Sequence, residues 1–178
     1  MKKLLFFLMV IGQSLASQAQ KYLAESSVVS FFSHGAIEDI SAKNSKTVSI
    51  FNATTGDVVF SIPIKDFEFE KSLMKEHFNE KYMETEKFPK ATFQGKITGF
   101  TITSVGEQVS KASGKLTIHG VTKDIDVPGT IEVVNGKVVM KSKFIVKLAD
   151  YSIAIPQLLW QNIAEEVETK IEFTYKAQ

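Results

Sequence analysis

Polar and apolar residues alternate along most of the chain. The clearest case is residues 114–127 (GKLTIHGVTKDIDV), where two alternating runs flank the His119-Gly120 step. Successive side chains of a strand point to opposite faces, so Leu116 and Ile118 share one face and most of the charged residues lie on the other. Glycine gives the backbone the freedom that a reversal needs. The segment therefore predicts a β-hairpin with one apolar and one polar face.

The same pattern recurs along the rest of the chain. Apolar residues recur at every second position from Val58 to Ile64. Because proline cannot donate a ladder hydrogen bond, that strand is expected to end at Pro63 or to lie at an irregular edge. Asn135-Gly136 is the strongest further turn signal, since both residues tolerate positive φ. The pattern predicts strands at 28–32, 40–51, 58–64, 90–103, the two hairpin strands with an extension to 133, 138–148 and 166–175.

Two places interrupt this pattern. Residues 72–82 carry apolar residues at helical spacing, and Ser72 is the expected N-cap. We predict one short amphipathic helix there, lying over the sheet or over the end of a barrel. Its apolar side consists of Leu73, Met74, His77, Phe78 and Tyr82. Within 90–103, Gly95 and Gly99 mark a possible bulge or bend.

About eight strands with one helical insert indicate an all-β fold. Antiparallel strands with one polar face bury the other face either by closing into a barrel or by packing on a second sheet. We predict a single domain over residues 20–178, an eight-stranded antiparallel barrel, with a β-sandwich as the alternative. The interior of such a barrel is either filled by side chains or holds one small ligand.

The first nineteen residues have the layout of a secretory signal. Lys2 and Lys3 precede an apolar run at 4–11, and Ser17 and Ala19 are small residues placed before a cut at Gln20. The apolar run is too short to span a bilayer, although a retained N-terminal anchor is the alternative. We therefore expect residues 1–19 to be removed and the product to be periplasmic or secreted, without an integral membrane segment.

The charge balance excludes one class of partner. The chain has 21 basic and 20 acidic residues, and every basic residue is Lys. Removal of residues 1–19 leaves 19 basic residues against the same 20 acidic ones, so the mature chain is nearly neutral. A nucleic-acid-binding protein would need a basic stripe, so nucleic acid is not expected as a partner.

No catalytic or metal-binding motif stands out. His34, His77 and His119 are far apart and show none of the paired spacing of a metal site. The chain has no Cys, no Gly-x-Ser-x-Gly elbow and no phosphate-binding glycine loop. We expect His119 to order its turn and His77 to lie on the apolar side of the helix. The expectation is a protein without enzymatic activity, cofactor or metal.

Phenylalanine is the remaining chemical signal. Of 14 Phe residues, 12 lie after residue 19, and many of them fall at inward positions. They either fill the barrel or line an apolar tunnel, and the pattern alone does not decide between the two.

Two motifs resemble the signatures of a known family. GKLTIHGVTKDI at 114–125 and ETEKFPKATF at 84–93 are similar to motifs of the YceI-like proteins, and the likeness extends over about 27–175. The resemblance implies a periplasmic, lipocalin-like barrel linked to polyisoprenoid and lipid binding. The family's Arg-Asp-x-His-Leu helix start corresponds best to 74–78 (MKEHF), where His77 matches but the Arg is missing. A neutral or singly charged lipid is therefore expected in preference to a polyprenyl pyrophosphate.

From the resemblance we interpret the chain as an exported carrier of an elongated apolar ligand, such as an isoprenoid or a fatty acyl chain. An enzyme acting on a small hydrophobic substrate and a filled barrel serving as an interaction module remain alternatives. The oligomeric state is not predicted. The mouth is expected at Lys75, His77 and Tyr82. The expected tunnel lining is Phe31, Phe60, Ile62, Phe93, Leu116, Ile118, Phe144, Val146, Ile171 and Phe173.

Overall fold

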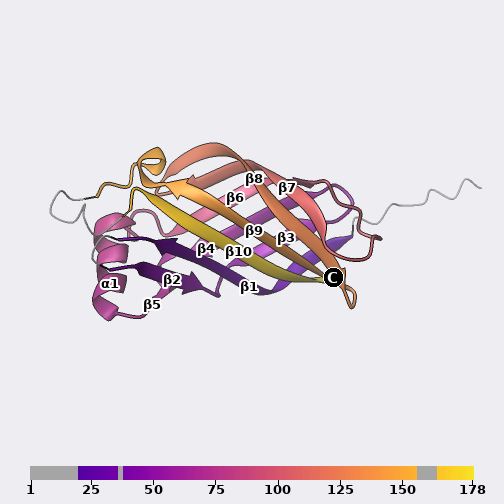
Figure 1. The fold of residues 1–178 in the computed structure, drawn as a ribbon, viewed down its shortest axis with the longest axis horizontal. Helices are drawn as coiled ribbons and strands as arrows, with labels where there is room; N and C mark the ends of the chain where they lie inside the picture. Colours follow the sequence, from indigo (N-terminus) through magenta and orange to yellow (C-terminus); the bar gives the residue numbers. More distant parts are fainter. Residues whose placement is uncertain (1–19, 36–37, 156–163) are drawn as a thin grey trace, which may run out of the picture.

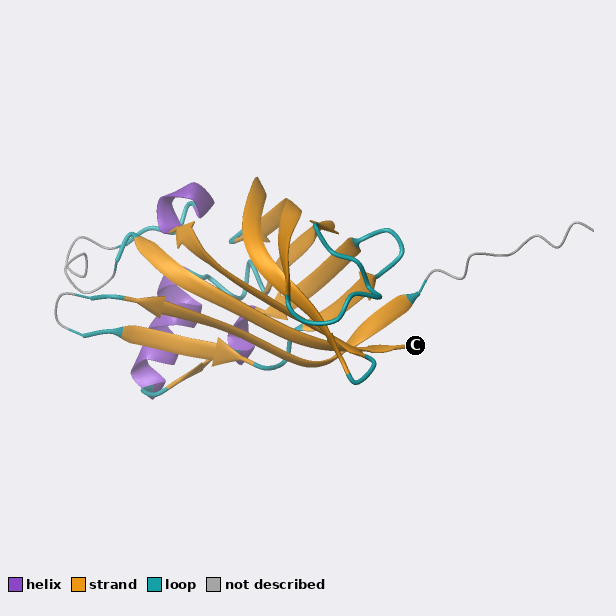
Figure 2. Ribbon diagram, turned by 45° about the vertical axis from the view of Figure 1, so that its right-hand side comes forward, coloured by secondary structure: helices purple, strands orange, loops and turns teal. Residues whose placement is uncertain are grey.

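A computed structural model describes residues 20–35, 38–155 and 164–178. The predicted signal segment, residues 1–19, lies outside the described residues. Within them, eight strands form a closed antiparallel barrel (Figures 1 and 2). These strands are β1 (Lys21–Ser33), β3 (Val48–Asn52), β4 (Asp57–Pro63), β6 (Lys90–Thr98), β7 (Gln108–Ile118), β8 (Val121–Val134), β9 (Lys137–Lys147) and β10 (Glu166–Ala177).

The order of the strands confirms the predicted barrel. Neighbours run β10-β9-β8-β7-β6-β4-β3-β1, and β10 pairs back with β1 to close the ring. Both predicted turns have the expected backbone, because φ is positive at His119 and Gly120 and again at Asn135 and Gly136. The hairpin of β7 and β8 also has the predicted polar outer face, where Lys115 Nζ lies 2.9 Å from Asp124 Oδ1.

The expected single strand at 40–51 is wrong. Residues there form β2 (Ile40–Asn44) and β3, and β2 pairs with the end of β1 on one side and with β5 (Glu68–Phe69) on the other. Asn44 causes the break because its Oδ1 accepts hydrogen bonds from the Lys46 backbone and from the Thr47 hydroxyl. Its amide also donates to the carbonyl of Pro63, where β4 ends as predicted.

The prediction for 90–103 was too long. β6 ends at Thr98, and the next residue, Gly99, has a φ of 83° that turns the chain away from the sheet. Gly95 makes no bulge, since its pairing with Gly114 continues the register without a shift. A Cβ at Gly114 would lie 2.4 Å from Gly95 Cα, so the two strands approach too closely there for side chains.

The helical insert spans the predicted residues 72–82, but only its first part is α-helical and its cap differs from the prediction. An α-helix, α1 (Ser72–His77), continues into one π-helical turn, η2 (Phe78–Tyr82). Lys71 occupies the N-cap position without a side-chain hydrogen bond, so the assignment of Ser72 as N-cap is wrong. Helix α1 and the turn η3 (Leu148–Tyr151) lie at the same end of the barrel (Figure 1).

His119 holds the segments at this end together. Its Nδ1 lies 3.2 Å from the carbonyl oxygen of Tyr151, and its Nε2 lies 3.1 Å from Oε2 of Glu84. The ring also packs edge-on against Phe88, with the centroids 4.5 Å apart. The hairpin turn is thus joined both to the loop after η2 and to η3. His119 does more than order its own turn, because it positions two segments beside the barrel opening.

The opposite end of the barrel is filled. Phe51, Ile131, Val138 and Tyr175 are fully buried there. Ser49 Oγ lies 2.7 Å from the Tyr175 hydroxyl and donates to the Val59 carbonyl at 3.0 Å. Because the single serine hydrogen is used on that carbonyl, the tyrosine hydroxyl is the donor to Ser49. Burial raises the pKa of Tyr175, so this hydroxyl stays protonated.

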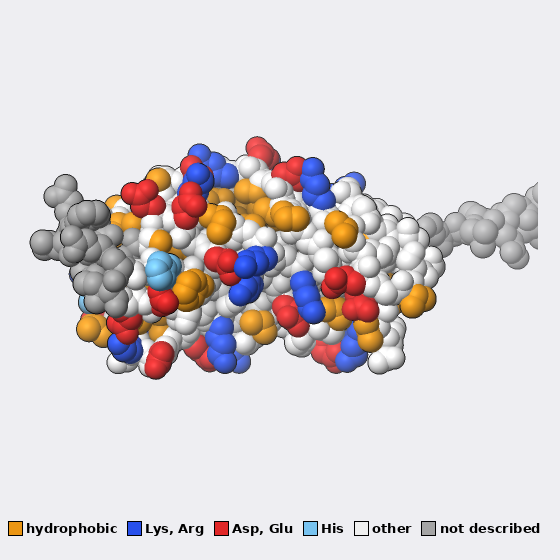
Figure 3. All heavy atoms as spheres, viewed as in Figure 1, with side chains coloured by type: hydrophobic (Ala, Val, Ile, Leu, Met, Phe, Trp, Pro, Cys, Tyr) orange, Lys and Arg blue, Asp and Glu red, His pale blue; other side chains and the backbone are white. Residues whose placement is uncertain are grey.

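The outer face of the barrel carries charges of both signs. Lys147 and Glu166 pair across β9 and β10 at 3.1 Å, and Lys143 and Glu168 pair at 2.6 Å. Acidic and basic side chains are interspersed over the face seen in Figure 3. Such exposed pairs contribute little to stability, so their main effect is to keep the outer wall polar.

We expect Tyr175→Phe to lower the free energy of unfolding by about 1–2 kcal/mol, because Ser49 Oγ is left buried without its donor. The measurement is urea denaturation. Ser49→Ala is the matched variant that removes the other partner. The double variant should cost less than the sum of the two single ones, and strict additivity would contradict the proposed coupling.

Glu84 should make the stability of the protein depend on pH. Hydrogen bonds from Lys87 and then from His119 lower the pKa of Glu84 below the ordinary value of 4.5. A lowered folded-state pKa stabilises the protein above the unfolded value, and this effect is lost as the pH falls through the folded value. Glu84→Gln should therefore lower Tm at neutral pH, and the difference should shrink below about pH 4.5. Glu86→Gln is the exposed control, and a difference that persists at low pH would contradict the assignment.

Candidate functional site

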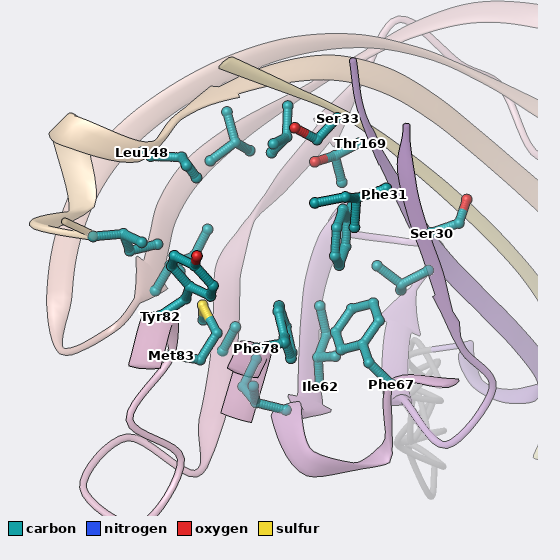
Figure 4. Close-up of a pocket in the computed structure, with 18 of the residues that line it drawn as sticks. Ser30, Phe31, Ser33, Ile62, Phe67, Phe78, Tyr82, Met83, Leu148 and Thr169 are labelled. Atoms are coloured by element: carbon teal, nitrogen blue, oxygen red, sulfur yellow. The ribbon is translucent and has the colours of Figure 1, made fainter. Parts of the chain in front are cut away.

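A cavity of about 440 Å³ lies between the inward faces of the strands and the helical cover (Figure 4). Its walls come from β1, β4, β6, β7, β9 and β10, and α1 with η2 covers one side. The walls are apolar because each strand turns its alternate apolar residues inward. The cavity therefore takes up the interior at the end of the barrel opposite Tyr175.

Most of the predicted tunnel residues line this cavity. Phe93 and Phe173 do not, although both are almost fully buried. Alternation gave the correct face for these two residues but not their depth along the barrel. The predicted residues that do line the cavity are Phe31, Phe60, Ile62, Leu116, Ile118, Phe144, Val146 and Ile171.

The helical cover contributes the side that was predicted to be apolar. Leu73, Met74, His77, Phe78 and Tyr82 all line the cavity. Lys75, which was expected at the mouth, is not among the lining residues, because it lies on another side of the helix.

Aromatic contacts hold the cover in place. The ring of Phe78 lies 5.5 Å from Phe31, 5.5 Å from Phe67 and 5.0 Å from Phe69, measured between centroids. Phe31 belongs to β1, whereas Phe67 and Phe69 come from the segment between β4 and α1. This cluster closes one side of the cavity with rings from three separate elements, and all four rings face it.

Few polar groups reach the cavity. The hydroxyl groups of Ser33, Tyr82 and Thr169 lie on its wall, while Ser30 turns its hydroxyl away from it (Figure 4). Burial raises the pKa of the Tyr82 phenol, which therefore stays protonated and can donate a hydrogen bond. Ser33 Oγ already accepts a hydrogen bond from the backbone of Ala164 at 3.1 Å.

Ionisable groups are scarce on the lining. Apart from the Tyr82 phenol, the described lining residues include only Glu38 and His77, and the Glu38 carboxylate forms an ion pair with Lys71. No cluster of three or more potential metal-ligating side chains occurs in the part of the chain that the structure describes. Nor does any helix among the described residues have the length and hydropathy needed to cross a bilayer.

Several lining residues had not been assigned to the site. Val29, Ile64 and Val167 carried a usable signal, because each continues the inward alternation of a predicted strand. Met83 and Ile153 carried none, since they lie in irregular segments where no periodicity indicates which side chains turn inward.

Comparisons with known proteins agree with this geometry. None of the curated proteins compared with the chain matches it. Among solved structures, BcnA of Burkholderia cenocepacia is 18% identical with a TM-score of 0.71, covering 83% of this chain and 95% of its own. A polyisoprenoid binding domain from Saccharophagus degradans, implicated in plant cell wall breakdown, is 18% identical with a TM-score of 0.76, covering 90% of this chain and 100% of its own.

The YceI protein of Campylobacter jejuni is 21% identical with a TM-score of 0.58, covering 75% of this chain and 80% of its own. At these identities the likeness establishes the fold alone. The family assignment comes from the sequence model of the YceI-like domain, which matches residues 21–175. The chain belongs to the YceI-like family.

Proposed function

We propose that this protein is an exported carrier that holds one elongated apolar molecule in the cavity of its barrel. The observation that carries the proposal is the cavity itself, whose lining is almost entirely carbon. Its volume of about 440 Å³ is within the range of roughly 300–1,000 Å³ typical of small-molecule sites. A barrel filled by side chains, as expected of an interaction module without ligand, would not contain such a cavity.

Binding in this cavity would rest on the hydrophobic effect. Each methylene group removed from water contributes about 0.8 kcal/mol, less the cost of ordering the chain. The inward rows of Leu116, Phe144 and Ile171 supply the apolar surface for the chain. The hydroxyl groups of Tyr82 and Thr169 are the groups that a polar end of the ligand would meet.

The ligand class is part of the proposal. The polyisoprenoid binding domain from Saccharophagus degradans shares the fold, and this supports an isoprenoid or a similar lipid as ligand. Binding is favoured over catalysis because the described lining has no pair of carboxylates and its one carboxylate, Glu38, is already engaged by Lys71. The basic start, apolar run and small residues of the first nineteen positions support export to the periplasm or the medium.

We expect Ile118→Trp to abolish retention of a co-purifying apolar molecule, because the indole would occupy the cavity next to the cover. Thr117→Trp is the matched control, since this neighbouring side chain does not line the cavity and instead bonds Thr122 on the outside. The measurement is native mass spectrometry of protein purified without detergent, followed by lipid extraction. A bare mass for the wild type and for both variants, also after incubation with farnesol, would contradict the carrier function.

We also expect farnesol to bind at least about tenfold more tightly than farnesyl diphosphate, since a buried anion without a partner is strongly unfavourable. Displacement of a fluorescent apolar probe measures both affinities. Lys75→Met should leave the ratio unchanged, because Lys75 does not line the cavity. If the diphosphate binds as tightly as farnesol and Lys75→Met removes that affinity, Lys75 is the head-group ligand expected from the sequence.

A further inference from the structure

The cavity ends against aromatic rings in the middle of the barrel. Phe60 lines the cavity, and its ring stacks on Phe93 with centroids 5.2 Å apart and an interplanar angle of 22°. Phe173 packs edge-on against Phe60, with the centroids 5.5 Å apart. Phe93 and Phe173 are 3% and 2% exposed and do not line the cavity. We call these three rings the aromatic floor.

The chain makes room for this floor with two glycines. Gly95 and Gly114 are paired across β6 and β7, and both lie on the inward face. A Cβ at Gly95 would lie 2.6 Å from Cζ of Phe93. The ring of Phe93 therefore lies over Gly95, in space that a side chain at that position would occupy.

Further rings continue below the floor to the closed end. Phe173 contacts Tyr175 with centroids 5.9 Å apart, and Tyr175 contacts Phe51 at the same distance. Phe100 then packs on Phe51 at 5.6 Å. No residue of this lower set lines the cavity, so the described interior is divided into a filled half and a hollow half.

The depth of the hollow half limits the length of a ligand. On β1 the lining runs from Val29 to Ser33, and on β4 and the turn after it from Phe60 to Ile64. At about 3.3 Å per residue, either stretch spans about 13 Å along the strand. A chain longer than this has to fold back on itself or leave part of its apolar surface in water.

We propose, building on the proposed carrier function, that the aromatic floor makes this protein selective for short apolar chains and that Phe93 sets the limit. The ligand class is an uncharged chain of geraniol-to-farnesol length, not a long polyprenyl lipid. Phe93 is the residue to change because loss of its ring would extend the cavity into the space that the ring now fills beside Gly95. Phe60 is less suitable, since it lines the cavity and would contact the ligand itself.

The test is a competition among prenols of increasing length. The full-length protein, expressed for export, is incubated with an equimolar mixture of geraniol, farnesol, geranylgeraniol and solanesol, and native mass spectrometry measures which prenol is bound. In the wild type the bound fraction should peak at geraniol or farnesol, with solanesol at least about tenfold below the peak. Phe93→Ala should shift the peak to geranylgeraniol or longer. Phe93→Leu keeps more of the packing and should give a smaller shift in the same direction.

Phe100→Ala is the matched control. It removes a ring of the same kind that packs below the floor against Phe51 and does not line the cavity, so the peak should stay where it is in the wild type. Equal binding of solanesol and farnesol by the wild type would overturn the length limit while leaving the carrier function intact. An unshifted peak in both folded Phe93 variants would overturn the role of Phe93. Failure of the wild type to bind any prenol would instead count against the proposed isoprenoid carrier function.

Discussion

Closure of the barrel depends on the pairing of β1 with β10, the first and last strands. Their ladder runs from Tyr22 opposite Ala177 to Phe32 opposite Glu168, with one register shift beside Ser26. Without this pairing both strands would be open edges, and the inward apolar rows would be exposed to water. The closure also sets the interior volume of the barrel, which side chains or a ligand must then occupy. The character of the site follows from how that volume is divided.

The interior of the barrel is divided into a filled half and a hollow half. In the filled half, burial of aromatic rings and the bond from Tyr175 to Ser49 stabilise the fold. In the hollow half, Ile62, Leu116 and Val146 are buried as well, but they line a cavity of about 440 Å³ that side chains leave unfilled. The close approach of Gly95 and Gly114 lies at the boundary, because it leaves space for the ring of Phe93. The filled interior and the cavity therefore occupy different stretches of the same strands.

The sequence predicted well which side chains point into the barrel. It predicted poorly how far along the barrel axis each of them lies. Alternation placed Leu116 and Ile171 on the inward face, and both line the cavity. The same rule could not distinguish them from Phe173, since a period of two contains no information on position along the barrel axis. Asn44 split a predicted strand through local side-chain hydrogen bonds that a hydrophobic pattern does not record. Met83 reached the cavity from a loop, where only the tertiary structure decides which way a side chain points.

The cover of the cavity is held by contacts rather than by its own helical stability. Helix α1 has six residues and none of them is buried, and a helix of that length is not stable alone. It stays in place because Phe78 packs on Phe31, Phe67 and Phe69, and because His119 anchors the loop that follows at Glu84. These contacts are separate from the β1–β10 ladder and from the rings below the floor. The cover can therefore differ in stability from the barrel, because its loss would leave every strand of the ring paired.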